Sequence, residues 1–444
     1  MTHAHQRVVL RIIIPSILIL ALCISAALLY MHLRRPRLVH AGSNRLAFVD
    51  ETAASNNQIG RPSVRSGCIA NWNGRFVYIT SEGSYVLVRS VIDKQIVETI
   101  PADIQWPAPS IQVIADGPKL YLLFYDGKKG PCLALCENGR EPLVTALLPA
   151  NTLMWPGKWI SEPEWDSTLT WRSSDFQLQE DGSLEGLVGI YRRKKGEYYT
   201  DPEEEITADF WFRYIDGKVK YSKVGEHMGA MDFRLVPSGP GYPSGLLSGY
   251  GDRLYYREVR LNKDGKPVIG EEKMADLHIP TSGRVRGFEL IPPAADDAGE
   301  LKVLLRTYSD LGFDYETANT IWGDYAWKLV SIDRKSFSVK SNKPLFGFGD
   351  FDEISDDYSN IMKRYGNWVV IVGYKEDYSK PSLLAFDINR LKGYMLRIEN
   401  KNSLMDLGLF QYSDSQVGIG YMQWDDKKTL PKNILDIYKL ILPK

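Results

Sequence analysis

The chain has 444 residues, with 54 basic and 55 acidic side chains and a formal net charge of -1. No basic stripe stands out from this balance, which argues against a nucleic-acid partner. Aromatic residues make up 11% of the chain and glycines are frequent, a combination that favours strands joined by tight turns and therefore an all-β fold.

The first predicted element is an uncharged apolar run over residues 12–31. Its length suits a helix that crosses a bilayer. The run is followed by "HLRRPR" and not by a small-x-small cleavage site, which favours an uncleaved anchor. The sequence therefore predicts a short N-terminal tail over residues 1–11, a single transmembrane helix over 12–31 and a juxtamembrane linker over 32–65.

The charges that flank this run bear on its orientation. Arg34, Arg35 and Arg37 follow it and only Arg7 and Arg11 precede it, a bias that would place the C-terminal domain in the cytoplasm by the positive-inside rule. A single N-terminal helix before a large β domain more often carries that domain outward, and no Asn-x-Ser/Thr acceptor follows the helix. We therefore expect a single-pass protein of a bacterial inner membrane, with an extracytoplasmic C-terminal domain.

Cysteine and histidine spacing predicts no cofactor and no metal site. If "CLALC" is a strand, Cys132 and Cys136 lie about 13 Å apart at the strand rise of roughly 3.3 Å, which is too far for a disulfide. Cys68 pairs with one of them, or all three are free thiols of the kind that pack as small hydrophobes. Zinc-type spacings such as C-x2-C are absent from the sequence.

One hairpin pattern recurs four times along the chain. Each copy is an apolar-rich strand that ends at an aspartate, a short polar turn and a second apolar-rich strand. The four aspartates are Asp93, Asp216, Asp333 and Asp387. Because an aspartate side chain bonds the backbone two residues further on, we interpret them as turn residues of outer hairpins and not as a ring of metal ligands.

A second pattern, a turn followed by an apolar strand, recurs seven times after residue 66. The instances start at residues 73, 116, 181, 250, 298, 365 and 413. Such units, each with about four strands, are the signature of β-propeller blades, which bury both sheet faces against their neighbours. Two β-sandwiches, the competing architecture, do not predict one hairpin repeated along the chain.

In this repeat pattern the chain resembles the β-propeller group, over about 380 residues. The resemblance implies an architecture of seven four-stranded blades over residues 66–444, with the strand at 45–51 pairing with one at 434–442 to close the ring. The Gly-His and Trp-Asp period of WD40 repeats, the double glycines of kelch repeats, the YWTD motif and the sialidase Asp-box are absent. No family's functional residues can therefore be carried over.

Two aromatic segments, residues 154–171 and 310–327, are the candidate sites. Aromatic rings beside carboxylates are typical of sugar-binding clefts, and paired acids also hydrolyse glycosidic bonds. Tryptophan anchors are equally typical of protein-binding hot spots, and large aromatics also fill cores between blades. The candidate ligand- or partner-binding residues are Trp155, Trp159, Glu164, Trp165, Asp166, Trp171, Asp314, Tyr315 and Trp322.

The sequence supports two functional hypotheses and assigns no catalytic residue. The first is a membrane-anchored propeller that binds or scaffolds a protein partner in a cell-envelope complex. The alternative is a propeller enzyme that acts on glycans, as a glycoside hydrolase or lyase. The enzyme requires convergent carboxylates, one of them with a raised pKa, whereas the scaffold requires an exposed apolar or aromatic patch.

Overall fold

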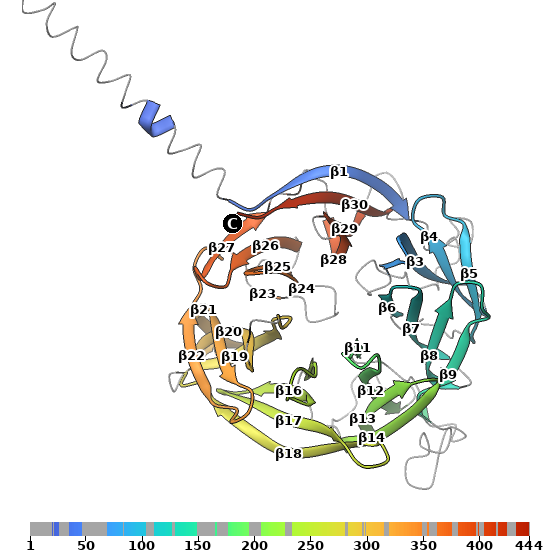
Figure 1. Ribbon diagram of the computed structural model, residues 1–444. Coiled ribbons are helices and arrows are strands. Elements are labelled where there is room, and N and C mark those ends of the chain that lie inside the picture. The colour runs from blue at the N-terminus through green and yellow to red at the C-terminus, as the bar shows by residue number, and fades with distance from the viewer. Residues whose placement is uncertain are drawn as a thin grey trace, which may run out of the picture.

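The computed structural model describes most of the chain after the N-terminal segment. The described residues are 20, 22–25, 35–46, 69–82, 84–103, 111–126, 129–148, 165–166, 176–194, 206–226, 233–279, 283–294, 297, 299–314, 319–348, 353–354, 362–374, 381–396, 398, 404–413, 416–423 and 432–443. They form a ring of seven antiparallel sheets, a seven-bladed β-propeller (Figure 1). The predicted all-β propeller of seven blades is therefore confirmed.

The first four blades, A to D, run along the chain from the innermost to the outermost strand. Blade A consists of β2 (Ile69–Trp72), β3 (Arg75–Glu82), β4 (Tyr85–Ser90) and β5 (Ile96–Pro101). Blade B consists of β6 (Gln112–Asp116), β7 (Lys119–Asp126), β8 (Gly130–Glu137) and β9 (Leu143–Ala146). Blade C consists of β10 (Trp165–Asp166), β11 (Phe176–Leu178), β12 (Leu184–Lys194), β13 (Ile206–Ile215) and β14 (Lys218–Glu226). Blade D consists of β15 (Phe233–Val236), β16 (Ser244–Tyr250), β17 (Arg253–Leu261) and β18 (Pro267–Asp276).

The last three blades, E to G, complete the ring. Blade E consists of β19 (Gly283–Leu290), β20 (Glu300–Asp314), β21 (Asn319–Asp333) and β22 (Val339–Pro344). Blade F consists of β23 (Glu353–Ile354), β24 (Met362–Tyr365), β25 (Trp368–Tyr374), β26 (Pro381–Asp387) and β27 (Lys392–Leu396). Blade G consists of β28 (Leu404–Ser413), β29 (Gln416–Gln423), β30 (Lys432–Ile441) and, from the other end of the chain, β1 (Arg37–Leu46).

Ring closure involves a different N-terminal strand from the one predicted. The sequence favoured residues 45–51, but the structure pairs β1, residues 37–46, with β30 as the outermost strand of blade G (Figure 1). The closing position in the last blade was predicted correctly to within two residues. An outermost strand packs on one side only, so β1 needs few apolar residues and gives a weak sequence signal.

The repeat frame is also shifted in blade D. The strand after the turn at residue 250 was expected to be equivalent to the other six, which are all second strands of their blades. It is β17, the third strand, and β16 is the second. Gly251, with φ of 63°, makes the connection from β16 to β17 as tight as the turns that elsewhere join the first and second strands.

The recurring aspartates lie in the turns of outer hairpins, as predicted. In three of them the carboxylate accepts a backbone N–H two residues further on: Asp93, Asp333 and Asp387. At the fourth, Asp216 and Gly217 both have positive φ, 49° and 75°, the backbone of the two-residue turn that matches strand twist. The pattern is therefore structural.

The cysteines of β8 pack in the hydrophobic core. Cys132 and Cys136 are both free and fully buried, in the cluster that joins blades A and B. Burial raises the pKa of each thiol to about 12, so neither forms a thiolate at neutral pH. Between the two alternatives, the structure supports unpaired thiols for these positions; Cys68 lies outside the described residues.

The predicted transmembrane segment is described only in part. Leu20 and residues 22–25 have helical backbone and exposed side chains. Within the described ranges, no helix has the length and hydropathy needed to cross a membrane. The rest of the predicted span lies outside those ranges, so the anchor stays a prediction.

Candidate functional site

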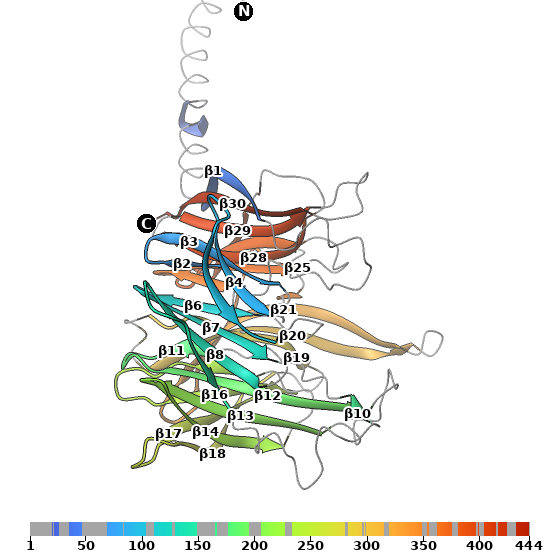
Figure 2. The same ribbon diagram turned by 90° about the vertical axis from the view of Figure 1, so that its right-hand side faces the viewer.

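The two faces of the ring differ in the connections that they carry. Because the blades are antiparallel, the turns between first and second strands and between third and fourth strands share one face, here called the turn face. The connections between second and third strands and between successive blades share the other, here called the loop face (Figure 2). Both aromatic segments identified in the sequence are connections of the loop face or adjoin it.

The most prominent element of the loop face is the outer end of the β20–β21 hairpin. Residues 310–314 pair with residues 319–322, beyond Ser309, where the pairing with β19 ends. On the other strand, pairing with β22 begins only at Lys328. This two-stranded extension, here called the ribbon, projects from the ring (Figure 2). A register shift occurs next to Gly312, whose φ is 132°, so the ribbon is bent by a β-bulge.

The ribbon contains two of the candidate residues. Asp314 pairs with Asn319 at its outer end, and Trp322 pairs with Asp310 near its base. Tyr315 lies between the two strands, outside the described residues. The sequence thus located this element by its aromatic content. The two 15-residue strands themselves were not predicted, although the long strand-like run on each side of "ETAN" was the available signal.

The other aromatic segment contributes a short inner strand to the same face. Trp165 and Asp166 form β10, which pairs with Lys194 and Arg193 at the loop-face end of β12. The ribbon belongs to blade E and β10 to blade C, with blade D between them (Figure 2). The other predicted residues of this segment lie outside the described residues: Trp155, Trp159, Glu164 and Trp171.

The inner strands hold two charged features that the sequence did not suggest. Arg234 on β15 and Glu289 on β19 form a buried ion pair across the junction of blades D and E, with an N–O distance of 2.5 Å. Lys363 on β24 retains some accessible surface, but desolvation lowers its pKa to about 8. In the Arg234–Glu289 pair, the opposite charge across the junction offsets the cost of removing each charge from water.

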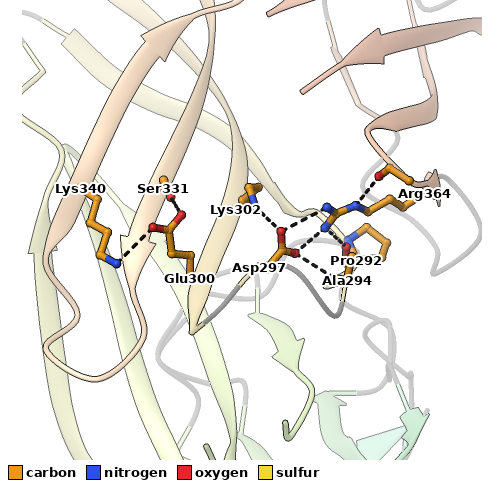
Figure 3. Close-up of polar contacts among 9 residues, drawn as sticks. Pro292, Ala294, Asp297, Glu300, Lys302, Ser331, Lys340 and Arg364 are labelled. Carbon is orange, nitrogen blue, oxygen red and sulfur yellow. Dashed lines mark hydrogen bonds and ion pairs between the residues drawn. The ribbon is translucent and has the colours of Figure 1, made fainter. Parts of the chain in front are cut away.

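The junction of blades E and F is held by a cluster centred on Asp297 (Figure 3). Its carboxylate accepts hydrogen bonds from Lys302 on β20, from Arg364 on β24 and from the backbone N–H of Ala294, the last at 2.8 Å. Arg364 also donates to the carbonyl oxygen of Pro292 at 2.9 Å. Burial raises the pKa of Asp297, but these donors outweigh it and hold that pKa at about 2.

Every carboxyl group with a shifted pKa in the described part of the chain is shifted downward. These groups are Asp93, Asp181, Glu258, Asp297, Glu300 and Asp333. Hydrogen-bond donors and neighbouring cations lower these pKa values, whereas a general acid needs a raised one. The described part of the chain also contains no group of three or more His, Cys, Asp or Glu side chains that could hold a metal ion.

Comparison with known proteins identifies the fold and no family. No protein-family model and no curated protein matches the sequence. The polysaccharide lyase Uly1 is similar in structure, with a TM-score of 0.50, 10% identity and coverage of 90% of this chain and 99% of that chain. A fungal alcohol oxidase in complex with copper has a TM-score of 0.49, with 10% identity and coverage of 90% and 76%. An oligogalacturonate lyase in complex with manganese has a TM-score of 0.41, with 11% identity and coverage of 89% of each chain. At these identities the similarity shows the β-propeller fold alone.

Proposed function

We propose that this propeller is a binding module whose loop face engages a protein partner, with the ribbon as the main contact element. The observation that carries the proposal is the extension of β20 and β21 beyond the strands that flank them. A two-stranded hairpin without a sheet is marginally stable in water. Its exposed edges accept an additional strand, and the ribbon sequence includes Trp322, the residue type most enriched at hot spots.

Photo-crosslinking from the ribbon tests this proposal. A crosslinking amino acid at position 322, activated in intact cells, is expected to yield one adduct of discrete mass because a docked partner lies against the ribbon. The matched control is position 92, since Ile92 is 75% exposed but lies in the β4–β5 turn of the opposite face. Adducts of equal yield from both positions, or none from the ribbon, would contradict the proposal.

A glycan-acting enzyme is the alternative. Uly1, a structure of similar fold, is a polysaccharide lyase, but that similarity extends to the fold alone. No raised carboxyl pKa is found in the described part of the chain, so the alternative depends on the acids of the two aromatic segments, Glu164 and Asp166 in one and Asp314 in the other. Release of glycan fragments by the wild type, lost when Glu164 and Asp166 are both replaced by Ala, would establish it and refute a purely binding role.

We further propose that residues 12–31 anchor the propeller to a membrane, with the ring on the extracytoplasmic side. Arg37 begins β1, six residues after Met31. Six extended residues span about 20 Å, so blade G would stand within about 20 Å of the bilayer surface. The ring would thus be tethered at its rim, with the loop face free for a partner.

Protease accessibility distinguishes the two orientations. A tag after Lys444 is expected to be cleaved in intact spheroplasts, because β30 and the propeller would lie outside the cytoplasmic membrane. A cytoplasmic protein with the same tag serves as the control and should be cleaved only after lysis. Protection of the propeller until lysis would reverse the proposed orientation, in agreement with the three arginines after the apolar run.

A further inference from the structure

The exposed apolar side chains of the propeller gather at the turn face, which lies opposite the ribbon (Figure 2). Within the part of the chain that the structure describes, eleven large apolar side chains of the propeller are exposed, and only Tyr85, Met274 and Met395 among them lie at loop-face ends of strands. Six of the eleven flank the turns between the third and fourth strands of four consecutive blades, A to D. They are Ile92, Ile96, Leu143, Ile215, Leu261 and Val268. Single exposed apolar residues are normal on a protein surface, but a group that shares one face marks contact with a protein or a membrane.

Each of these four turns also presents a cation beside its apolar side chains. The exposed cations are Lys94, Arg140, Lys218 and Lys263. Each turn contains one acidic residue as well, so apolar contact, and not net charge, is the main attraction that these turns can offer. Apolar side chains flanked by lysine or arginine are typical of protein segments that lie in the headgroup region of a bilayer.

The outermost strand of blade G places the start of the propeller on the same face. Arg37, the first residue of β1, pairs with Ile441, the last residue of β30. Because β30 is the third strand of its blade, it ends at the turn face, and β1 therefore begins there. The apolar run ends at Met31, six residues before Arg37, and six extended residues span about 20 Å. A bilayer that holds residues 12–31 would thus lie beside the turn face. Blade G is also next to blade A in the ring.

We propose that the turn face of blades A to D rests on the surface of the lipid bilayer that holds the N-terminal segment. This inference depends on the membrane anchor proposed above and adds the orientation of the ring to it. Ile92, Ile215 and Leu261 enter the headgroup region, and the neighbouring cations lie at the level of the lipid phosphates. The loop face and the ribbon then point away from the membrane, toward a partner.

Quenching by brominated lipids tests this orientation on the full chain in liposomes. A genetically encoded fluorescent amino acid replaces Ile92 or Leu261, and the liposomes contain phosphatidylglycerol with acyl-chain-brominated phosphatidylcholine. The matched control positions are Tyr85 and Met274, which lie at the loop-face ends of the same two blades; Met274 is 49% exposed and Leu261 is 44% exposed. We expect about twofold quenching at positions 92 and 261, because apolar side chains at an interface enter the bilayer by about 5–10 Å, and almost none at positions 85 and 274.

Flotation of the same liposomes separates the orientation from the anchor. A chain that does not float with the liposomes has no anchor, which overturns both proposals. A chain that floats without quenching at positions 92 and 261, or with equal quenching at all four positions, keeps the anchor and overturns the orientation alone.

A pair of charge variants gives a second measurement. Ile92→Asp combined with Leu261→Asp is expected to abolish quenching of a probe at position 215, because a carboxylate is costly to bring into the bilayer. The variant should still float through residues 12–31. Tyr85→Asp combined with Met274→Asp is the control and should leave the quenching at position 215 unchanged. Equal losses in the two double variants, or no loss in either, would also overturn the orientation.

Discussion

Deletion of β1, residues 37–46, is expected to prevent formation of a stable closed ring. β1 pairs with β30 along its whole length, and its removal exposes that strand as a new sheet edge. It also removes Ser43, whose hydroxyl donates to Asp436 at 2.5 Å. Asp436 is 1% exposed, so the lost hydrogen bond falls on a buried carboxylate. We expect a loss of more than about 5 kcal/mol, which is comparable to the entire stability of many domains.

Thermal unfolding followed by near-ultraviolet circular dichroism measures this effect. The matched control replaces residues 311–321 with Asn-Gly, a deletion of similar size that shortens the ribbon outside the ring. Because Asp310 and Trp322 are adjacent across the ribbon, a two-residue turn joins them without strain. The control is expected to unfold within a few degrees of the wild type. A β1 deletion that unfolds as late as this control would show that the ring closes without β1, through the packing of β28 and β30 against blade A.

The architecture was predictable from the sequence because it depends on local turns. Turns such as Asp216–Gly217 are local, since the residues that bend the chain also identify the bend. Seven recurrences therefore gave the blade number. The predicted equivalence of the strands was wrong in blade D because Gly251 produces an equally tight turn one strand later. The predicted bounds of the N-terminal strand were wrong because an outermost strand such as β1 has few apolar residues by which to recognise it.

The candidate surfaces were only partly predictable. Aromatic content located the ribbon and β10, because composition is a property of a segment. The ion pair of Arg234 with Glu289 joins residues 55 positions apart, and it forms only where blades D and E meet. Such features arise from the angle between neighbouring sheets, which no local pattern encodes. Charged residues on inner strands are therefore recognised only after the ring is assembled.

Asp297→Asn is expected to destabilise the propeller by about 3 kcal/mol, the lower end of the range for breaking a buried ion pair. Asp297 and Arg364 are each 6% exposed, so the substitution leaves the buried charge of Arg364 and the partly buried charge of Lys302 without their carboxylate. Denaturant unfolding of Asp297→Asn, Arg364→Gln and the double variant gives the coupling between the two residues. Asp264→Asn, an exposed acid, is the control and should change the free energy of unfolding by less than about 0.5 kcal/mol.

The pH dependence of stability provides a separate test of the same cluster. The pKa of Asp297 falls from an ordinary 3.8 to about 2 in the folded protein, where the donors from Arg364 and Lys302 outweigh burial. A lowered folded-state pKa contributes stability above the unfolded-state pKa and loses it as the pH falls toward the folded-state value. The wild type should therefore lose stability between about pH 5 and pH 2 more steeply than Asp297→Asn, which has no carboxyl group to protonate at this position. Parallel pH profiles would mean that the charge of Asp297 does not hold blades E and F together, and the junction would then depend on its apolar contacts.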